Sequence, residues 1–317
     1  MNTMAVVLEQ PGHIRFGQIG ITPPAETDVV VDIEFSGIST GTEKLLWSGS
    51  MPFFPGMGYP LVPGYESVGR VRQAGAASGL REGQTVFVPG ARCFGEIRGL
   101  FGGAASRVVV PGDRVVPISD QLGERSVLLA LAATAYHAVA GSAPHGPHQP
   151  PELIVGHGVL GRLLARLTVL SGAPAPVVWE RNPQRAAGAI GYPVIRPEDD
   201  DRRNYRVIYD VSGDASLLDS LVARTAPGGE IVLAGFYTQP IAFAFAPAFM
   251  RETHLRVAAE WKRADLLAVK WLIESGQLSL DGLLTHLEPA SRAAHAYPVA
   301  FDDPACLKMV LDWRQSA

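Results

Sequence analysis

The feature of this sequence that most limits its possible folds is a run of three spaced glycines between a short apolar segment and a helical one. The run, Gly156-His157-Gly158-Val159-Leu160-Gly161, follows the apolar residues 153–155 and opens the periodic segment 159–170. In a strand–turn–helix unit, the first glycine allows a tight turn, the second lets the backbone approach a pyrophosphate, and the third lets helix and strand pack closely. The helix N-terminus then faces the phosphate charge. The run therefore predicts a dinucleotide site, and a glycine-rich turn without a ligand is the alternative.

The kind of dinucleotide is indicated by the end of the next predicted strand, residues 176–180. Glu180 ends this strand about 20 residues after the last glycine, where a carboxylate accepts hydrogen bonds from the adenosine ribose. Such bonds to a charged acceptor contribute roughly 1.5–3 kcal/mol, and the same charge repels the 2′-phosphate of NADP. We therefore expect NAD as the cofactor, although Arg181 and Arg185 follow directly and could receive a 2′-phosphate. Arg181 is included in the predicted site, as are Ser212 and Gly235 at later strand ends.

The strand pattern divides the chain into two domains, because its 317 residues exceed what one hydrophobic core usually supports. Short Val-, Ile- and Phe-rich segments between Gly and Pro clusters predict a small β-barrel at 5–8, 29–35, 67–73, 84–88 and 106–110. After a Leu- and Ala-rich helix at 122–140, strands and helices alternate, which predicts an α/β fold with a doubly wound parallel sheet. Its elements are expected at 153–155, 159–170, 176–180, 205–211, 230–234 and 264–274. We expect residues 1–121 and 263–317 to form the barrel domain and 122–262 the nucleotide-binding domain.

Composition and charge exclude several classes of protein. Hydrophobic residues make up 47% of the chain and charged residues 18%, which is typical of a globular protein. The formal net charge is −4 and the basic residues are scattered, so we expect no nucleic-acid partner. The first ten residues do not resemble a signal peptide and no apolar run is long enough to span a bilayer. We therefore expect a cytoplasmic protein with no transmembrane segment. The two cysteines, Cys93 and Cys306, cannot form a four-thiolate zinc site.

Residues 235–250 form an unusual segment because both faces of its alternating pattern are apolar. Ile241, Phe243 and Phe245 alternate with alanines. Burial inside one chain is one interpretation, and a strand that pairs across a homodimer is the other. The sequence leaves both open.

The order of these parts resembles the medium-chain dehydrogenase/reductase superfamily over essentially the whole chain. The resemblance implies a GroES-like β-barrel catalytic domain and a Rossmann NAD-binding domain. Ser39, in the run Ser36-Gly37-Ile38-Ser39, stands where zinc-dependent members carry a catalytic cysteine. In the run Pro63-Gly64-Tyr65-Glu66, Tyr65 replaces their histidine ligand and only Glu66 is retained.

The same comparison implies that both zinc sites of the superfamily are lost. Residues 131–134, where a third ligand would come, offer none, and the short segment 92–103 contains only Cys93. A catalytic zinc needs three protein ligands and an open position. We therefore expect no metal.

A more specific resemblance lies in two longer runs of the first domain. They are Ser36-Gly37-Ile38-Ser39-Thr40-Gly41-Thr42-Glu43, followed by Leu45-Leu46-Trp47, and the segment 51–69 with its Pro63-Gly64-Tyr65-Glu66. These runs resemble the bacteriochlorophyllide a dehydrogenase family, which is also similar in length and in its abbreviated metal lobe. The resemblance implies NAD-dependent oxidation of the 3-(1-hydroxyethyl) group of a bacteriochlorophyllide to 3-acetyl, a late step of bacteriochlorophyll a synthesis.

Alcohol oxidation without zinc requires side chains that hold the hydroxyl oxygen and a base that takes its proton. We hypothesise that Ser39, Thr42, Tyr65 and Glu66 surround the reacting oxygen. Thr42 lies near the superfamily's proton relay, and Glu66 is the expected base or charge partner. Two alternatives stay open: Glu66 only pairs with an arginine, and Tyr65 only fills the space of the lost zinc ligand.

A chlorin is wide, flat and mostly apolar, so its binding site needs aromatic and methionine side chains. One Gly- and Pro-rich segment beside the predicted catalytic residues supplies them. We expect its large side chains to line the substrate mouth, namely Trp47, Met51, Phe53, Phe54, Met57 and Tyr59. The alternative is that this loop packs on its own barrel.

Two further functions stay open. A zinc-free reductase of quinones or enones shares the fold but usually prefers NADPH, which Glu180 disfavours. A nucleotide-binding protein without catalysis is the other, and turnover with any alcohol would exclude it.

Overall fold

The computed structural model describes residues 1–140, 142–143 and 146–316, and the chain divides into two compact units. Residues Met1–Ala130 and Leu280–Ala317 form one, here called the barrel unit, and Leu131–Ser279 form the other, the nucleotide unit. The sequence placed the boundaries after residues 121 and 262. In the structure, residues 263–279 lie in the nucleotide unit, where Asp265 hydrogen-bonds His137 at 2.8 Å.

The barrel unit is built from two mainly antiparallel sheets. One has the order β2-β1-β4-β7; the other has the order β18-β19-β3-β5-β6-β9, with β8 also paired to β3. The strands are β1 Asn2–Gln10, β2 His13–Gly20, β3 Asp28–Ile38, β4 Leu61–Val62, β5 Ser67–Ala74, β6 Thr85–Val88, β7 Arg98–Gly99, β8 Arg107–Pro111, β9 Val116–Pro117, β18 His286–Pro289 and β19 Met309–Asp312. The helices are α1 Thr42–Ser48, α8 Ala293–Asp302 and the 3-10 segments η1 Asp120–Leu128 and η4 Ala290–Arg292. The five strands expected from the sequence correspond to β1, β3, β5, β6 and β8.

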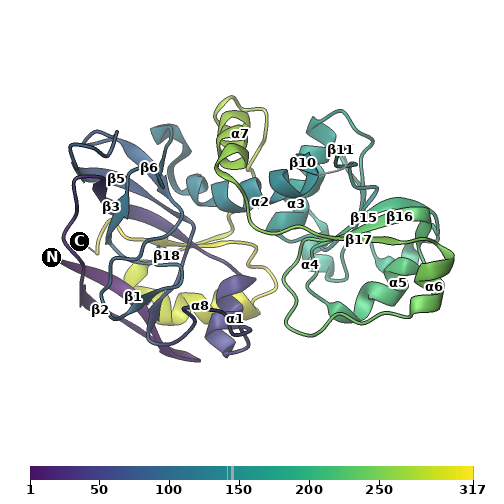
Figure 1. Cartoon of the computed structure of the whole chain (residues 1–317), viewed down its shortest axis with the longest axis horizontal. Helices are drawn as coiled ribbons and strands as arrows, with labels where there is room; N and C mark the ends of the chain where they lie inside the picture. Colours follow the sequence, from purple (N-terminus) through teal and green to yellow (C-terminus); the bar gives the residue numbers. More distant parts are fainter. Residues whose placement is uncertain (141, 144–145, 317) are drawn as a thin grey trace. The chain divides into compact units, whose positions relative to one another are not determined.

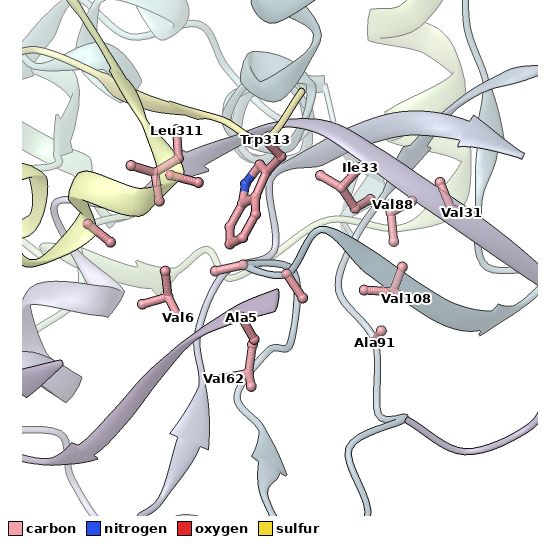
Figure 2. Close-up of a cluster of buried hydrophobic side chains, with 14 of the residues drawn as sticks. Ala5, Val6, Val31, Ile33, Val62, Val88, Ala91, Val108, Leu311 and Trp313 are labelled. Carbon is pink, nitrogen blue, oxygen red and sulfur yellow. The ribbon is translucent and has the colours of Figure 1, made fainter. Parts of the chain in front are cut away.

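The core of the barrel unit consists mainly of valine and alanine side chains (Figure 2). Beta-branched residues suit strands because they pack well on a pleated surface. Trp313, from the C-terminal end of the chain, lies among them and donates its indole N–H to Ser36 Oγ at 2.8 Å. The C-terminal segment is therefore an integral part of the barrel core.

Two segments that are distant in the sequence pair with the end of strand β3. Strand β19 pairs antiparallel with it, with Met309 opposite Ile38, and β5 pairs on the other side, with Ser67 opposite Ser36. The residues just outside these pairs, Lys308 and Glu66, are therefore brought to the end of β3.

The nucleotide unit contains a six-stranded, all-parallel sheet with the order β14-β13-β12-β15-β16-β17. Strands β15, β16 and β17 of this sheet are labelled in Figure 1. Its strands are β12 Leu153–Val155, β13 Val177–Trp179, β14 Val194–Ile195, β15 Tyr205–Asp210, β16 Thr225–Leu233 and β17 His254–Val257, and a short hairpin is formed by β10 Ser142–Ala143 and β11 Gly146–Pro147. Its helices are α2 Leu129–Ala140, which begins at the unit boundary, α3 Val159–Leu170, α4 Pro183–Ala186, α5 Leu218–Val222, α6 Phe245–Met250, α7 Arg263–Glu274, and the 3-10 turns η2 Pro197–Asp199 and η3 Ala215–Leu217. The strand order reverses at β12, so a crevice is expected beyond the carboxyl ends of β12 and β15.

Two expectations from the sequence are corrected. The helix expected at 122–140 is a 3-10 segment followed by α2, because Gly123 interrupts it with φ 52°. Residues 241–244 are not a strand, and 245–250 form α6, whose first turn contains Pro247, a residue suited to a helix start. Nor is the segment buried within the chain: Phe245 is 71% exposed and Met250 75%.

Among the described residues, no helix is both long and apolar enough to cross a membrane.

Candidate functional site

Of the three glycines in the 156–161 run, the fold itself restricts two to glycine, and the third leaves open space. Gly156 has φ 106°, a conformation that side chains disfavour. A Cβ on Gly161 would lie 1.9 Å from the carbonyl oxygen of Gly156, so only glycine lets α3 pack on the turn. Gly158 is the N-cap of α3, and a Cβ there would meet nothing within 4 Å. This open space beside a helix N-terminus fits the approach of a phosphate group.

Glu180 is held in the same turn by two backbone N–H groups. Its Oε2 accepts from His157 at 3.2 Å and its Oε1 from Asn182 at 2.8 Å. It lines a cavity of about 500 Å³ within the nucleotide unit, together with Gly156, Arg181 and Ser212. That volume is in the range of small-molecule sites, roughly 300–1,000 Å³. These residues therefore fit the adenosine half of a dinucleotide.

Several side-chain contacts of this region were not predicted from the sequence. Arg224 stacks on the ring of Trp179 at 4.5 Å, and both line the cavity. Asp210 accepts from the backbone N–H of Ser212 at 2.9 Å and from Tyr237 at 2.8 Å. Arginine and tryptophan at strand ends carry no local motif, so only the parallel sheet brings them together.

His157 has a structural place in the turn rather than an exposed one. Its ring is buried, with Nδ1 hydrogen-bonded to the carbonyl of Arg185 at 2.6 Å and Nε2 to the Tyr192 hydroxyl at 2.9 Å. Burial lowers the pKa of His157 to about 4, so the ring is neutral at physiological pH. Its backbone N–H, not its ring, contacts Glu180. Gly235 follows β16, and its N–H donates to the carbonyl of Asp210 at 3.0 Å.

In the barrel unit, three of the four expected catalytic residues form a cluster of hydroxyl groups. The Ser39 and Tyr65 oxygens share a hydrogen bond of 2.7 Å, and Thr42 also hydrogen-bonds the Tyr65 phenol. The Tyr65 ring packs edge-on against Phe101, with centroids 5.5 Å apart. Burial raises the pKa of Tyr65 well above its usual range, so the phenol keeps its proton and acts as a hydrogen-bond donor or acceptor.

Glu66, the fourth, lies behind this cluster and is fully buried. Its Oε2 accepts a 2.5 Å hydrogen bond from the Lys308 ammonium, so the partner is a lysine rather than the arginine considered from the sequence. A Cβ on Gly37 would lie 2.3 Å from this oxygen, so that glycine makes the space for the carboxylate. Burial raises the pKa of Glu66, and Lys308 acts in the opposite direction. Glu66 Oε1 is buried and has no hydrogen-bond partner in the described part of the chain.

A second buried carboxyl, Glu43, was missed from the sequence. Its oxygens accept from the backbone N–H of Ser39 at 3.0 Å and from the Tyr297 hydroxyl at 2.8 Å. Burial raises its pKa to about 7, with Glu66 adding to the shift and Lys308 opposing it. Glu43 is only four residues after Ser39, so the sequence could have indicated that the two lie close together. Its pairing with the distant Tyr297 could not be predicted from a local pattern.

The residues expected from the sequence at the superfamily's metal position do not fit a zinc ion. Ser39 and Tyr65 are weak zinc ligands, and each already hydrogen-bonds the other. No group of three or more His, Cys, Asp or Glu side chains that could hold a metal occurs among the residues described.

The aromatic segment expected at the substrate mouth mostly packs on the barrel. Trp47 contacts Tyr297 and Phe301, with ring centroids 6.5 and 6.3 Å apart. The other packed members lie against a small core of Leu8, Leu46, Leu61 and Leu100; they are Met51, Phe54, Met57 and Tyr59. Phe53 differs, because its side chain is 86% exposed. A half-buried side chain can pack on the core and still offer part of its surface to a ligand. Phe53 is the residue of this segment with the most surface available to a ligand.

Comparisons with known proteins agree with this architecture. Residues 25–120 match the alcohol dehydrogenase GroES-like domain. The chain is similar in fold to 2R,3R-butanediol dehydrogenase from Bacillus subtilis (TM-score 0.83, 19% identity, covering 98% of this chain and 99% of that one). It is also similar to a short chain alcohol dehydrogenase from Escherichia coli CFT073 complexed with NADH (TM-score 0.80, 20% identity, 98% and 99% coverage). The expected GroES-like barrel and Rossmann nucleotide domain are confirmed.

A curated relative decides the family. The 2-desacetyl-2-hydroxyethyl bacteriochlorophyllide A dehydrogenase of Rhodobacter capsulatus is 58% identical to this chain over 317 residues, covering 100% of both. The chain belongs to the 2-desacetyl-2-hydroxyethyl bacteriochlorophyllide A dehydrogenase family. It is thus an oxidoreductase of the alcohol dehydrogenase type.

Proposed function

We propose that this chain catalyses the NAD-dependent oxidation of the 3-(1-hydroxyethyl) group of a bacteriochlorophyllide to a 3-acetyl group, a late step of bacteriochlorophyll a synthesis. The observation that carries the proposal is the 58% identity, over the full length of both chains, to a dehydrogenase named for a hydroxyethyl bacteriochlorophyllide. In this proposal the hydroxyl cluster would hold the alcohol oxygen, and the dinucleotide turn would bind the hydride acceptor.

The cofactor of this proposal is NAD, bound by the nucleotide unit. The backbone at Gly158 and the N-terminus of α3 would receive the pyrophosphate, and Glu180 would accept hydrogen bonds from the adenosine ribose. The carboxylate at this place disfavours a 2′-phosphate, which supports NAD over NADP. When bound, oxidised NAD supplies the hydride acceptor.

The hydroxyl cluster would hold the alcohol oxygen of the substrate. The hydroxyl groups of Ser39, Thr42 and Tyr65 can accept a hydrogen bond from the alcohol O–H and can donate one to the alcohol oxygen. Glu66 would act as a charge partner behind them. Because the product ketone is conjugated with the macrocycle, the barrier to losing the hydride is lower than for an ordinary alcohol.

The apolar macrocycle would lie against the aromatic segment of the barrel unit. Phe53 is the most accessible aromatic side chain there, and the small leucine core holds Phe54, Met57, Tyr59 and Trp47 partly buried. A flat apolar ligand gains affinity mainly by covering such surface.

We also propose that the chain forms a homodimer in the cytoplasm, through the apolar surface that includes residues 235–250. This surface contains Phe245, Phe249 and Met250, and β17 provides Val257, 74% exposed, at an open sheet edge. Apolar patches of this kind are rarely left uncovered in soluble proteins. Light scattering tests this point: a mass of one chain at micromolar concentration would contradict it.

The reaction is tested by anaerobic incubation of the purified protein, with its zinc content measured, with NAD and 3-hydroxyethyl bacteriochlorophyllide a. The red-most absorption band should shift to that of the 3-acetyl product, without stoichiometric zinc. A shift that requires added zinc would reject the metal-free chemistry. Absence of a shift with either NAD or NADP, together with reduction of quinones or enones by NADPH, would favour the zinc-free reductase instead.

A further inference from the structure

Lys308 is a buried lysine whose ammonium makes specific contacts next to the hydroxyl cluster. Its side chain is 1% exposed. Its Nζ donates to Glu66 Oε2 at 2.5 Å and to the backbone carbonyl of Ile38 at 3.2 Å. Lysine is almost never fully buried unless it is paired, because taking the charge out of water is costly. A position that keeps such a group in spite of this cost calls for a functional explanation.

Lys308 contacts residues that are next in sequence to Ser39 and Tyr65. Ile38 directly precedes Ser39, and Glu66 directly follows Tyr65. The backbone N–H of Gly37 donates to the carbonyl of Glu66 at 2.8 Å, so the same two segments are also joined through their main chains. Lys308 therefore ties together the chain segments on which the 2.7 Å contact between Ser39 and Tyr65 depends.

The ammonium also places a positive charge in this buried region. Two carboxyls interact with it: Glu66, which is in contact with it, and Glu43, which interacts with both Lys308 and Glu66. The phenols of Tyr65 and Tyr297 interact with these carboxyls. A positive charge in a low-dielectric interior favours the anionic form of a nearby oxygen. In metal-dependent alcohol oxidation the metal ion stabilises the anionic oxygen. In this chain the ammonium of Lys308 is a positive charge at the end of β3.

We propose that Lys308 is the positioning residue of the hydroxyl site: it holds Ser39 and Tyr65 at hydrogen-bonding distance and provides the buried positive charge that favours loss of the substrate's hydroxyl proton. The inference rests on the proposed oxidation. In that reaction the carbinol carbon gives up a hydride with both electrons of its C–H bond to oxidised NAD, the oxygen gives up its proton to the hydroxyl cluster and then to solvent, and the C–O bond becomes a carbonyl. Lys308 acts through its charge and hydrogen bonds and transfers no atom.

The test compares Lys308→Met, the double variant Lys308→Met/Glu66→Gln, and wild type. Lys308→Met alone leaves Glu66 buried without a cation and is expected to unfold more easily. The double variant removes both charges and keeps similar shapes, so it should fold. The matched control is Lys270→Met, which breaks a lysine–glutamate pair of 2.6 Å on α7, in the nucleotide unit.

We expect the double variant to lose about 100-fold or more in kcat, the size of effect seen when one electrostatic stabiliser is removed. Its KM for the pigment and its Kd for NAD should change less than about threefold, since the Lys308 side chain is only 1% exposed and is not open to either ligand. Lys308→Met removes the positive charge alone, so its kcat–pH profile should move to higher pH, a shift that a purely structural role would not produce. Lys270→Met should match wild type in all of these. A double variant with wild-type kcat and pH profile would overturn the proposal.

A crystal structure of the double variant gives a readout that does not depend on activity. The proposal requires the Ser39 and Tyr65 oxygens to separate beyond hydrogen-bonding distance, about 3.5 Å. An unchanged contact contradicts the positioning role even if wild type oxidises no hydroxyethyl pigment. If wild type is inactive and the contact is lost, the proposed function fails while the positioning role stands.

Discussion

The Tyr297 hydroxyl donates a hydrogen bond of 2.8 Å to Oε2 of Glu43, across 254 residues of sequence and inside the barrel unit. The other oxygen of Glu43 accepts from the backbone N–H of Ser39. Both donors are uncharged, whereas Glu66 contacts the ammonium of Lys308. Of these two buried carboxyls of the barrel unit, Glu43 is therefore the one expected to change its protonation near neutral pH.

The first prediction follows from the pKa of Glu43, which burial raises from 4.5 to about 7. Between these values the folded state holds a proton that the unfolded state has lost, so stability falls as pH rises through this window. In Glu43→Gln the amide oxygen can accept from the Ser39 N–H and the amide NH2 can donate to the Tyr297 oxygen, so both contacts are kept and the titration is removed. The variant should equal wild type below pH 4.5 and be more stable above pH 7, by up to about 3 kcal/mol.

Urea unfolding of both proteins between pH 5 and 8 measures this difference. Glu9→Gln is the control, since Glu9 forms only an exposed pair with Arg15. A constant difference between Glu43→Gln and wild type across that range would show that Glu43 does not titrate there.

The second prediction separates two glycines of the nucleotide turn. Gly161→Ala would place a Cβ 1.9 Å from a backbone oxygen, so the variant should lose about 3 kcal/mol or more of stability. Gly158→Ala meets no atom within 4 Å and should keep or slightly gain stability. It should nevertheless bind NAD at least about tenfold more weakly, because its methyl group fills the place where the pyrophosphate approaches. Thermal unfolding and calorimetric titration give the two quantities. Wild-type NAD affinity in Gly158→Ala would argue against this cofactor site.

This turn was predictable because all the residues that form it are neighbours in the chain. The structure gives α3 the same bounds, Val159–Leu170, that periodicity indicated, and Gly156, Gly158 and Gly161 have the positions that their spacing implies. Strands with alternating apolar residues were likewise found, since their pattern is local. Short strands of two residues, such as β4 and β7, give no such pattern and were missed.

The polar groups behind the hydroxyl cluster could not be predicted in this way. Lys308 reaches Glu66 across 242 residues only because β19 inserts beside β3, and a lone lysine near a C-terminus is more often exposed. The prediction for residues 235–250 was wrong for another reason. Its alternation was read as a strand, but Pro247 favours the start of a helix, and local backbone preference decided the outcome.

The third prediction concerns the choice of dinucleotide. Glu180→Gln removes the charge that would accept the ribose hydroxyls, so affinity for NAD should fall about tenfold and affinity for NADP should rise. Glu198→Gln is the matched control, because Glu198 lines the same cavity but is exposed and pairs with Arg196 at 3.3 Å. Titration of both cofactors into both variants decides the matter. An equal loss in the two variants would mean that the negative potential of the cavity, rather than Glu180 itself, sets the affinity.

The last prediction separates packing from substrate binding in the aromatic segment of the barrel. Phe53 is 86% exposed, so Phe53→Ala should leave thermal stability unchanged and raise the KM for the pigment several-fold. Phe54 packs on the small leucine core, so Phe54→Ala should destabilise the barrel unit by about 1–2 kcal/mol, less than a fully buried phenylalanine would. Leu287→Ala, an exposed apolar residue of the same unit, is the control for surface effects. NAD affinity should be unchanged in all three, because the cofactor residues belong to the nucleotide unit. If Phe53→Ala and Leu287→Ala have the same KM, the aromatic segment serves only to complete the barrel core, and the macrocycle must bind elsewhere.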